Sequence, residues 1–81
     1  MKNKNKQFET SDFYISAYLL SQGVKLLTIN RTNPRRLLFV FEDVKDRQKM
    51  VEDFLLNKGL VEPKRYATTI KELKGLIYSA L

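Results

Sequence analysis

The segment from residue 24 to residue 42 constrains the fold most, because it places two apolar runs on either side of a short turn. The turn contains Asn33 and Pro34, a pair that interrupts helices and strands, and it is short enough to connect the two strands of a hairpin. The second run, Leu37–Phe41, contains no polar residue, whereas a strand with one face in water alternates apolar and polar side chains. We therefore expect a central antiparallel hairpin that helices cover on both faces.

Three helices are expected around this hairpin. The first begins after Thr10 or Ser11, either of which can cap its free N–H groups, and it ends at Gly23 in a left-handed conformation. Gly59 predicts the same kind of ending for the second helix. The expected elements are, in chain order, a helix at about 12–22, strands at about 24–30 and 35–42, and helices at about 46–58 and 66–79. Residues 9–81 are thus expected to form a single α+β domain of order α-β-β-α-α, after a flexible basic tail at residues 1–8.

Both strands of the hairpin and one stripe of the third helix are expected to supply the core. The residues expected to be buried are Leu26, Leu27, Ile29, Leu37, Leu38, Phe39, Val40 and Phe41 of the strands, and Tyr66, Ile70, Leu73, Ile77 and Ala80 of the helix. Tyr14 and Tyr18, one turn apart in an apolar helix, are expected to join them. An isolated hairpin is marginally stable and has two unpaired edges, so we also expect a homodimer or a larger protein partner.

The net charge of +6 makes a nucleic acid a candidate partner. The residues expected to contact it are Arg31, Arg35 and Arg36 at the hairpin tip, helped by Lys25, Lys64 and Arg65. Guanidinium groups suit phosphate because they donate two parallel hydrogen bonds. Contacts to phosphate predict weak sequence preference and a strong dependence on salt. The plainer alternative is that these charges face solvent, as charges in exposed turns commonly do.

Catalysis has little support in the sequence. It contains no histidine and no cysteine, which removes the most common general base, the thiolate nucleophile and most zinc sites. Asp43-Val44-Lys45 follows the second expected strand and resembles the acid-x-lysine element of metal-dependent nucleases. The neighbouring strand has Asn30 in place of the second carboxylate that such a site needs. We therefore expect no enzymatic activity, no metal, no cofactor and no small-molecule substrate.

The location of the protein is also constrained by its hydropathy. No apolar run approaches the length of about 18–20 residues that spans a membrane, and the basic N-terminus, residues 1–7, is not directly followed by the apolar region of a secretory signal. We expect a cytoplasmic protein with no membrane partner.

The chain contains several distinctive segments, namely Phe8–Leu20 followed by Gly23, then Arg36–Asp43, and further along Phe54-Leu55 and Tyr66. In these segments it resembles a family of short uncharacterised prokaryotic and phage-associated proteins. The family has no assigned activity, so the resemblance implies no catalytic or binding residue. The sequence as a whole predicts a small non-enzymatic protein that binds nucleic acid or associates with nucleoprotein through its basic hairpin tip. The alternative is a protein–protein adaptor or an oligomeric assembly subunit that uses the sheet edge and the third helix.

Overall fold

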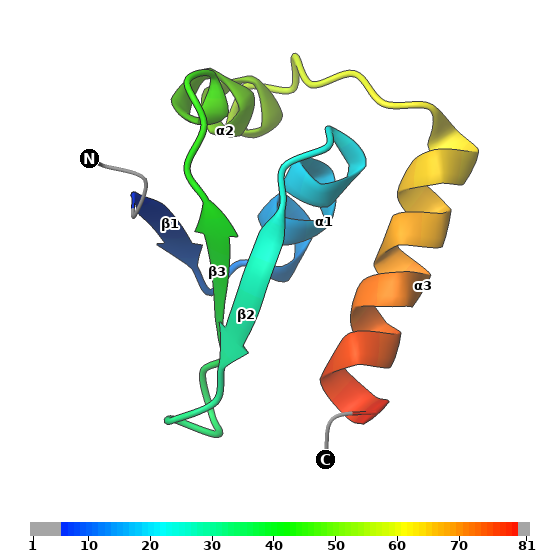
Figure 1. The fold of residues 1–81 in the computed structure, drawn as a ribbon. Helices are drawn as coiled ribbons and strands as arrows, with labels where there is room; N and C mark the ends of the chain where they lie inside the picture. Colours follow the sequence, from blue (N-terminus) through cyan, green and yellow to red (C-terminus); the bar gives the residue numbers. More distant parts are fainter. Residues whose placement is uncertain (1–5, 80–81) are drawn as a thin grey trace.

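The computed structural model describes residues 6–79, which form three strands and three helices (Figure 1). In chain order they are β1 (Gln7–Thr10), α1 (Phe13–Ser21), β2 (Leu26–Asn30), β3 (Leu38–Glu42), α2 (Arg47–Leu55) and α3 (Pro63–Ser79). The expected α+β class is confirmed, but the expected order lacks β1. Gln7 and Phe8 belong to this strand, so the assignment of a flexible tail to residues 1–8 is wrong at its C-terminal end. Residues 1–5 of that tail, and Ala80 of the expected helical stripe, lie outside the described residues.

The three strands form an antiparallel sheet in the order β1-β3-β2. The expected hairpin is present as β2 and β3, and β1 pairs with the other edge of β3, so that Phe8 lies opposite Phe41. The central position of β3 explains its uninterrupted apolar sequence, because both of its edges are paired. Phe39, Val40 and Phe41 are all buried.

A β-bulge in β2 changes which side chains of this strand face the core. Leu26 lies opposite Phe41 and Ile29 lies opposite Phe39, with an irregularity between Leu26 and Thr28. An extra residue in one strand of a pair shifts the alternation of side chains from that point on. Leu26 and Ile29 therefore share the core face and are half-buried, while Leu27 is 42% exposed. The expected burial of Leu27 is thus wrong.

The helices all lie on one side of the sheet (Figure 1). Ala17 and Leu19 of α1 pack with Phe39 and Phe41 in a single core, and Leu73 of α3 is fully buried in the same cluster. The expectation that helices cover both faces is therefore wrong. On the opposite face, Val40 is buried between its register partners on the two edge strands.

The tyrosines divide between the core and the surface. Tyr18 is buried and packs against Phe54 of α2, with the ring centroids 5.5 Å apart and the ring planes tilted by 42°, whereas Tyr14 is exposed, contrary to expectation. Tyr66 is half-buried and its hydroxyl donates a hydrogen bond to the carbonyl of Tyr14 at 3.2 Å. Burial raises the pKa of the Tyr66 hydroxyl.

The helices are capped and terminated in the expected ways, but two of the three residues involved differ from those expected. The cap of α1 is Asp12, whose carboxylate accepts a hydrogen bond from the Ile15 N–H at 2.9 Å, in place of Thr10 or Ser11. Gly23 has a φ of 92°, as expected after α1. After α2 the left-handed residue is Asn57, with a φ of 62°, and not Gly59.

Gly59 instead lies close to the side chain of Tyr18. A Cβ at Gly59 would lie 3.0 Å from the Tyr18 ring and hydroxyl. The next residue, Leu60, is 85% exposed.

Candidate interaction surface between β2 and α3

The arginines of the hairpin loop lie near the C-terminal end of α3. Arg31 is half-buried and its Nη2 donates a hydrogen bond to the carbonyl of Leu76 at 3.2 Å. Arg35 and Arg36 are exposed. Asn33 orders the turn, because its side-chain oxygen accepts from the Arg35 N–H and its carbonyl accepts from the Arg36 N–H, both at 3.0 Å. The hairpin tip therefore presents two solvent-exposed guanidinium groups, while the third is engaged with α3.

The other expected contact residues lie elsewhere in the molecule. Lys64 and Arg65 are in the first turn of α3, at the end of this helix that is remote from the hairpin tip (Figure 1). A helix of 17 residues is about 25 Å long at 1.5 Å per residue. Lys25 immediately precedes β2, and thus lies at the end of the strand opposite to the tip. The structure does not bring the six expected residues together.

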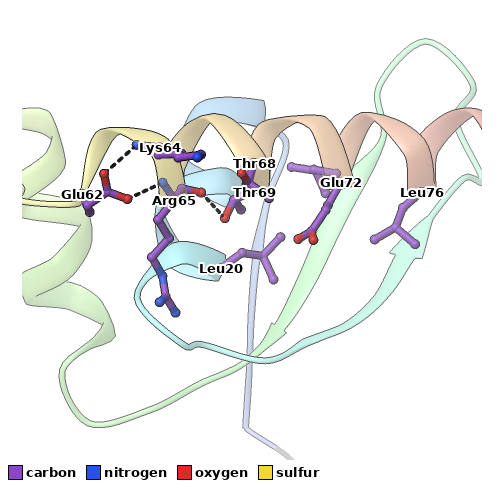
Figure 2. Close-up of a pocket in the computed structure, with 9 residues that line it drawn as sticks. Leu20, Glu62, Lys64, Arg65, Thr68, Thr69, Glu72 and Leu76 are labelled. Carbon is purple, nitrogen blue, oxygen red and sulfur yellow. Dashed lines mark hydrogen bonds between the residues drawn. The ribbon is translucent and has the colours of Figure 1, made fainter.

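The first turn of α3 is held by polar contacts of its own. Glu62 accepts hydrogen bonds from the N–H groups of Lys64 and Arg65 at 3.1 and 2.8 Å, as an N-terminal cap does (Figure 2). The Arg65 guanidinium donates a hydrogen bond from Nε to the carbonyl of Ser21 at 3.0 Å, so it provides a donor for a carbonyl group at the C-terminal end of α1. Arg65 thus has a structural contact that its sequence position does not reveal.

A groove separates the edge of β2 from α3. The groove has a volume of about 330 Å³ and is lined by Leu26, Leu27, Thr28, Ile29, Arg31 and Leu76. We call this set of residues the β2–α3 groove. Leu76 also lines a hollow of about 510 Å³ between α1 and α3, into which Leu20 and Glu72 project (Figure 2). Arg31 also lines a hollow of about 250 Å³ at the hairpin tip, beside Tyr78.

The groove combines exposed apolar side chains with an unpaired sheet edge. Leu27 and Leu76 are 42% and 49% exposed, and Tyr78 in the hollow at the hairpin tip is 69% exposed. Within residues 6–79, β2 pairs with β3 alone, so the N–H and C=O groups on its other edge have no strand partner. Sequence reasoning identified the sheet edge in general terms but missed Leu76, because this residue lies outside the apolar stripe of its helix.

A second set of exposed leucines lies at the end of α2. Leu55, Leu56 and Leu60 are each more than half exposed. None of them lines one of the hollows described above or lies on a sheet edge. These residues provide a comparison surface for experiments on the β2–α3 groove.

The nuclease-like motif has a structural role at its acidic residue. The Asp43 carboxylate accepts hydrogen bonds from Nε and Nη2 of Arg47 at 3.0 and 3.3 Å, and the Arg47 guanidinium stacks 4.1 Å from the centroid of the Phe8 ring. The hydrogen bond from Arg47 holds the pKa of Asp43 below its ordinary value. Residues 6–79 contain no group of three carboxylates that could hold a metal ion. In the same range, no helix has the length and apolar character needed to cross a membrane.

The structure defines a small α+β domain with an apolar groove beside an open sheet edge. Residues 5–79 match DUF5659, a domain of unknown function, and the chain belongs to this family. The expected kinship with an uncharacterised family is therefore confirmed. No curated protein and no solved structure matches the chain.

Proposed function

We propose that this chain is a non-enzymatic protein-binding module that holds its partner in the β2–α3 groove. The single observation that supports this proposal most is the position of Leu27 and Leu76, two exposed leucines on either side of a groove that runs along the edge of β2 that no strand of residues 6–79 pairs with. Apolar side chains around a concave surface favour a protein partner over solvent. The resemblance to prokaryotic and phage-associated proteins, and the lack of cysteine, support a place in the cytoplasm of a prokaryote.

The proposal is tested by selecting binders from a displayed library of random peptides on immobilised protein. The wild-type chain is expected to enrich peptides, and the variant Leu27→Asp/Leu76→Asp is expected to enrich none, because two carboxylates in the groove oppose apolar contacts. Both leucines are exposed, so the variant should fold, which thermal unfolding verifies.

A matched control places the same charges on the other leucine surface. Leu55→Asp/Leu60→Asp changes two residues that are exposed at the end of α2, and it should enrich the same peptides as the wild type. The proposed function is wrong if the wild type enriches no peptide, or if the groove variant enriches the same peptides as the wild type.

A second candidate function is the binding of nucleic acid at the hairpin tip. The specific observation in its favour is that Arg35 and Arg36 are both exposed and that the exposed ring of Tyr78 lies beside the same loop. Guanidinium groups can contact phosphates while an aromatic ring stacks on a base. This arrangement uses a smaller site than the six basic residues expected from the sequence.

Retention on heparin and binding to random DNA and RNA at two salt concentrations test this candidate. The variant Arg35→Ala/Arg36→Ala should bind more weakly and show a shallower salt dependence, because two phosphate contacts are removed. The control Lys64→Ala/Lys71→Ala removes the same charge from α3, away from the loop. Equal binding by wild type and tip variant, or no binding of the wild type at low salt, excludes this candidate.

A further inference from the structure

We infer that the occupant of the β2–α3 groove is an extended peptide segment that adds a fourth strand at the free edge of β2. In this inference the segment has apolar side chains at alternate positions and acidic residues toward both ends. The inference rests on the proposed function and adds to it the conformation and the chemistry of the partner.

The first argument is the backbone of β2. Its five residues form an edge strand, since β3 is its partner on one side and no strand of residues 6–79 lies on the other. An edge strand offers alternating N–H and C=O groups to a further strand, and a groove between an edge strand and a helix is a recurrent site for extended peptides. A helical partner could fill the groove but would leave these backbone groups without partners.

The second argument is the lining of the groove. Leu27 and Leu76 line the same groove, and Leu76 projects from α3 toward β2, so the face of an added strand that points toward α3 meets apolar side chains. Successive side chains of a strand point to opposite faces, and only alternate residues would point toward α3. The apolar residues of the partner are therefore expected at every second position.

The third argument is charge. Lys25 and Arg31 flank β2 at its two ends, and neither forms an ion pair within residues 6–79. Arg31 lines the groove itself, whereas Arg35 and Arg36 lie in the loop and do not line the groove. Acidic residues in the partner would meet a positive charge at each end of the strand.

Charge also distinguishes this partner from a second copy of the chain. If two β2 strands paired antiparallel about a twofold axis at Thr28, Lys25 of each copy would face Arg31 of the other. Like charges directly opposite each other destabilise a pair of strands. The groove therefore suits a partner of opposite charge better than it suits itself.

The test uses the peptides enriched on the wild-type chain, resynthesised with N-methyl groups at alternate residues. N-methylation removes the N–H donors and keeps the side chains. For a strand added to β2, methylation of one alternate set should weaken binding about tenfold or more, and methylation of the other set should have little effect. If both sets of N-methyl groups change the affinity equally little, the peptide is not held as a strand and the inference is overturned.

The role of charge is tested with a double-mutant cycle. Arg31→Gln should weaken an enriched acidic peptide about fivefold, and it should not weaken the same peptide with Asn and Gln in place of its acidic residues. Arg36→Gln is the matched control in the loop and should leave both affinities unchanged. Enriched peptides without acidic residues, or an equal loss for both peptides in Arg31→Gln, overturn the chemistry assigned to the partner.

The outcomes separate this inference from the proposed function. If no peptide is enriched, the proposed function fails and the inference fails with it. If peptides are enriched and are lost in Leu27→Asp/Leu76→Asp, but bind as helices or ignore N-methylation, the protein-binding function stands and the inference alone is wrong. A dimer of the wild-type chain that is abolished by Leu76→Asp would identify a second copy as the occupant and would also overturn it.

Discussion

Two glycines of this chain differ in what the backbone requires of them. Gly23 follows α1 with a φ of 92°, and Gly75 lies inside α3; at both positions the space around a Cβ is empty. Gly23→Ala is expected to lower the free energy of unfolding by about 1–2 kcal/mol, because a Cβ is strained at positive φ. Gly75→Ala is expected to raise it by about 0.5–1 kcal/mol, because alanine favours the helix more than glycine does.

Urea unfolding of the two variants measures this contrast. The substitution is chemically identical at both positions, so a difference in sign reports the backbone conformation and not the added methyl group. A loss of stability in Gly75→Ala, or a gain in Gly23→Ala, would contradict the conformations assigned to these residues.

Asp43 and Arg47 form the ion pair that packs against Phe8 of β1. Since the folded-state pKa of Asp43 lies below its ordinary value of 3.8, the stabilisation is fully present above about pH 4. It is lost as the pH falls through the lowered folded-state pKa. Asp43→Asn should therefore reduce the free energy of unfolding by about 0.5–1 kcal/mol at pH 7, and this difference from the wild type should disappear in acid.

Urea unfolding at several pH values between 7 and the acid range tests this dependence. The control is Asp46→Asn at the N-terminal end of α2, where the side chain makes no capping hydrogen bond. Its effect should stay within about 0.5 kcal/mol. A difference between Asp43→Asn and the wild type that grows as the pH falls would show that the pair does not stabilise the fold in the way described.

At the scale of elements, the hairpin and the helices were predictable because their signals are local. Asn33-Pro34 marks the turn, and the apolar spacing of α3 marks its buried stripe. The strand β1 was missed because it has four residues and a single large apolar side chain, Phe8. It forms because β3 offers a free edge to it, which is a property of the tertiary structure.

The bulge in β2 and the positions of the basic residues could not be predicted from the local sequence. Leu26, Leu27 and Ile29 are all apolar, so the sequence does not indicate which of them faces the core. The bulge, which places Leu27 at the surface, is visible only in the pairing of β2 with β3. The positions of Lys64 and Arg65 depend on the direction of α3, which carries them to the end of the helix away from the hairpin tip. The candidate site was predictable as an open edge of β2 but not as a groove.

The core face of the sheet gives a prediction at this scale. Phe39→Ala is expected to reduce the free energy of unfolding by about 3–5 kcal/mol, because it removes a buried ring from the central strand. Leu27→Ala should cost less than about 1 kcal/mol, since the bulge leaves this leucine exposed. Thermal or urea unfolding of both variants checks this. Similar costs for the two would indicate that β2 has no bulge at this position.

At the scale of the whole molecule, the third strand alters the case for self-association. The homodimer was expected because an isolated hairpin has two free edges, and β1 occupies one of them within the same chain. The remaining edge of β2 has positive residues at both ends, which disfavour antiparallel pairing with a second copy. A predominantly monomeric protein is the expected state, with the groove open to a different partner.

A charge reversal at Arg31 tests this explanation directly. In an antiparallel pair of β2 strands centred on Thr28, Arg31→Glu would place a carboxylate opposite Lys25 of the other copy at both ends. The two repulsive pairs become attractive, so the variant is expected to dimerise at concentrations where the wild type is a monomer, and added salt should weaken this dimer. Arg36→Glu changes the net charge equally but lies in the loop, and this variant should remain monomeric.

Sedimentation equilibrium across a range of protein concentrations and at two salt concentrations measures the oligomeric state of the three proteins. A wild-type dimer, or an Arg31→Glu variant as monomeric as Arg36→Glu, would show that charge at the ends of β2 does not control what pairs with this edge.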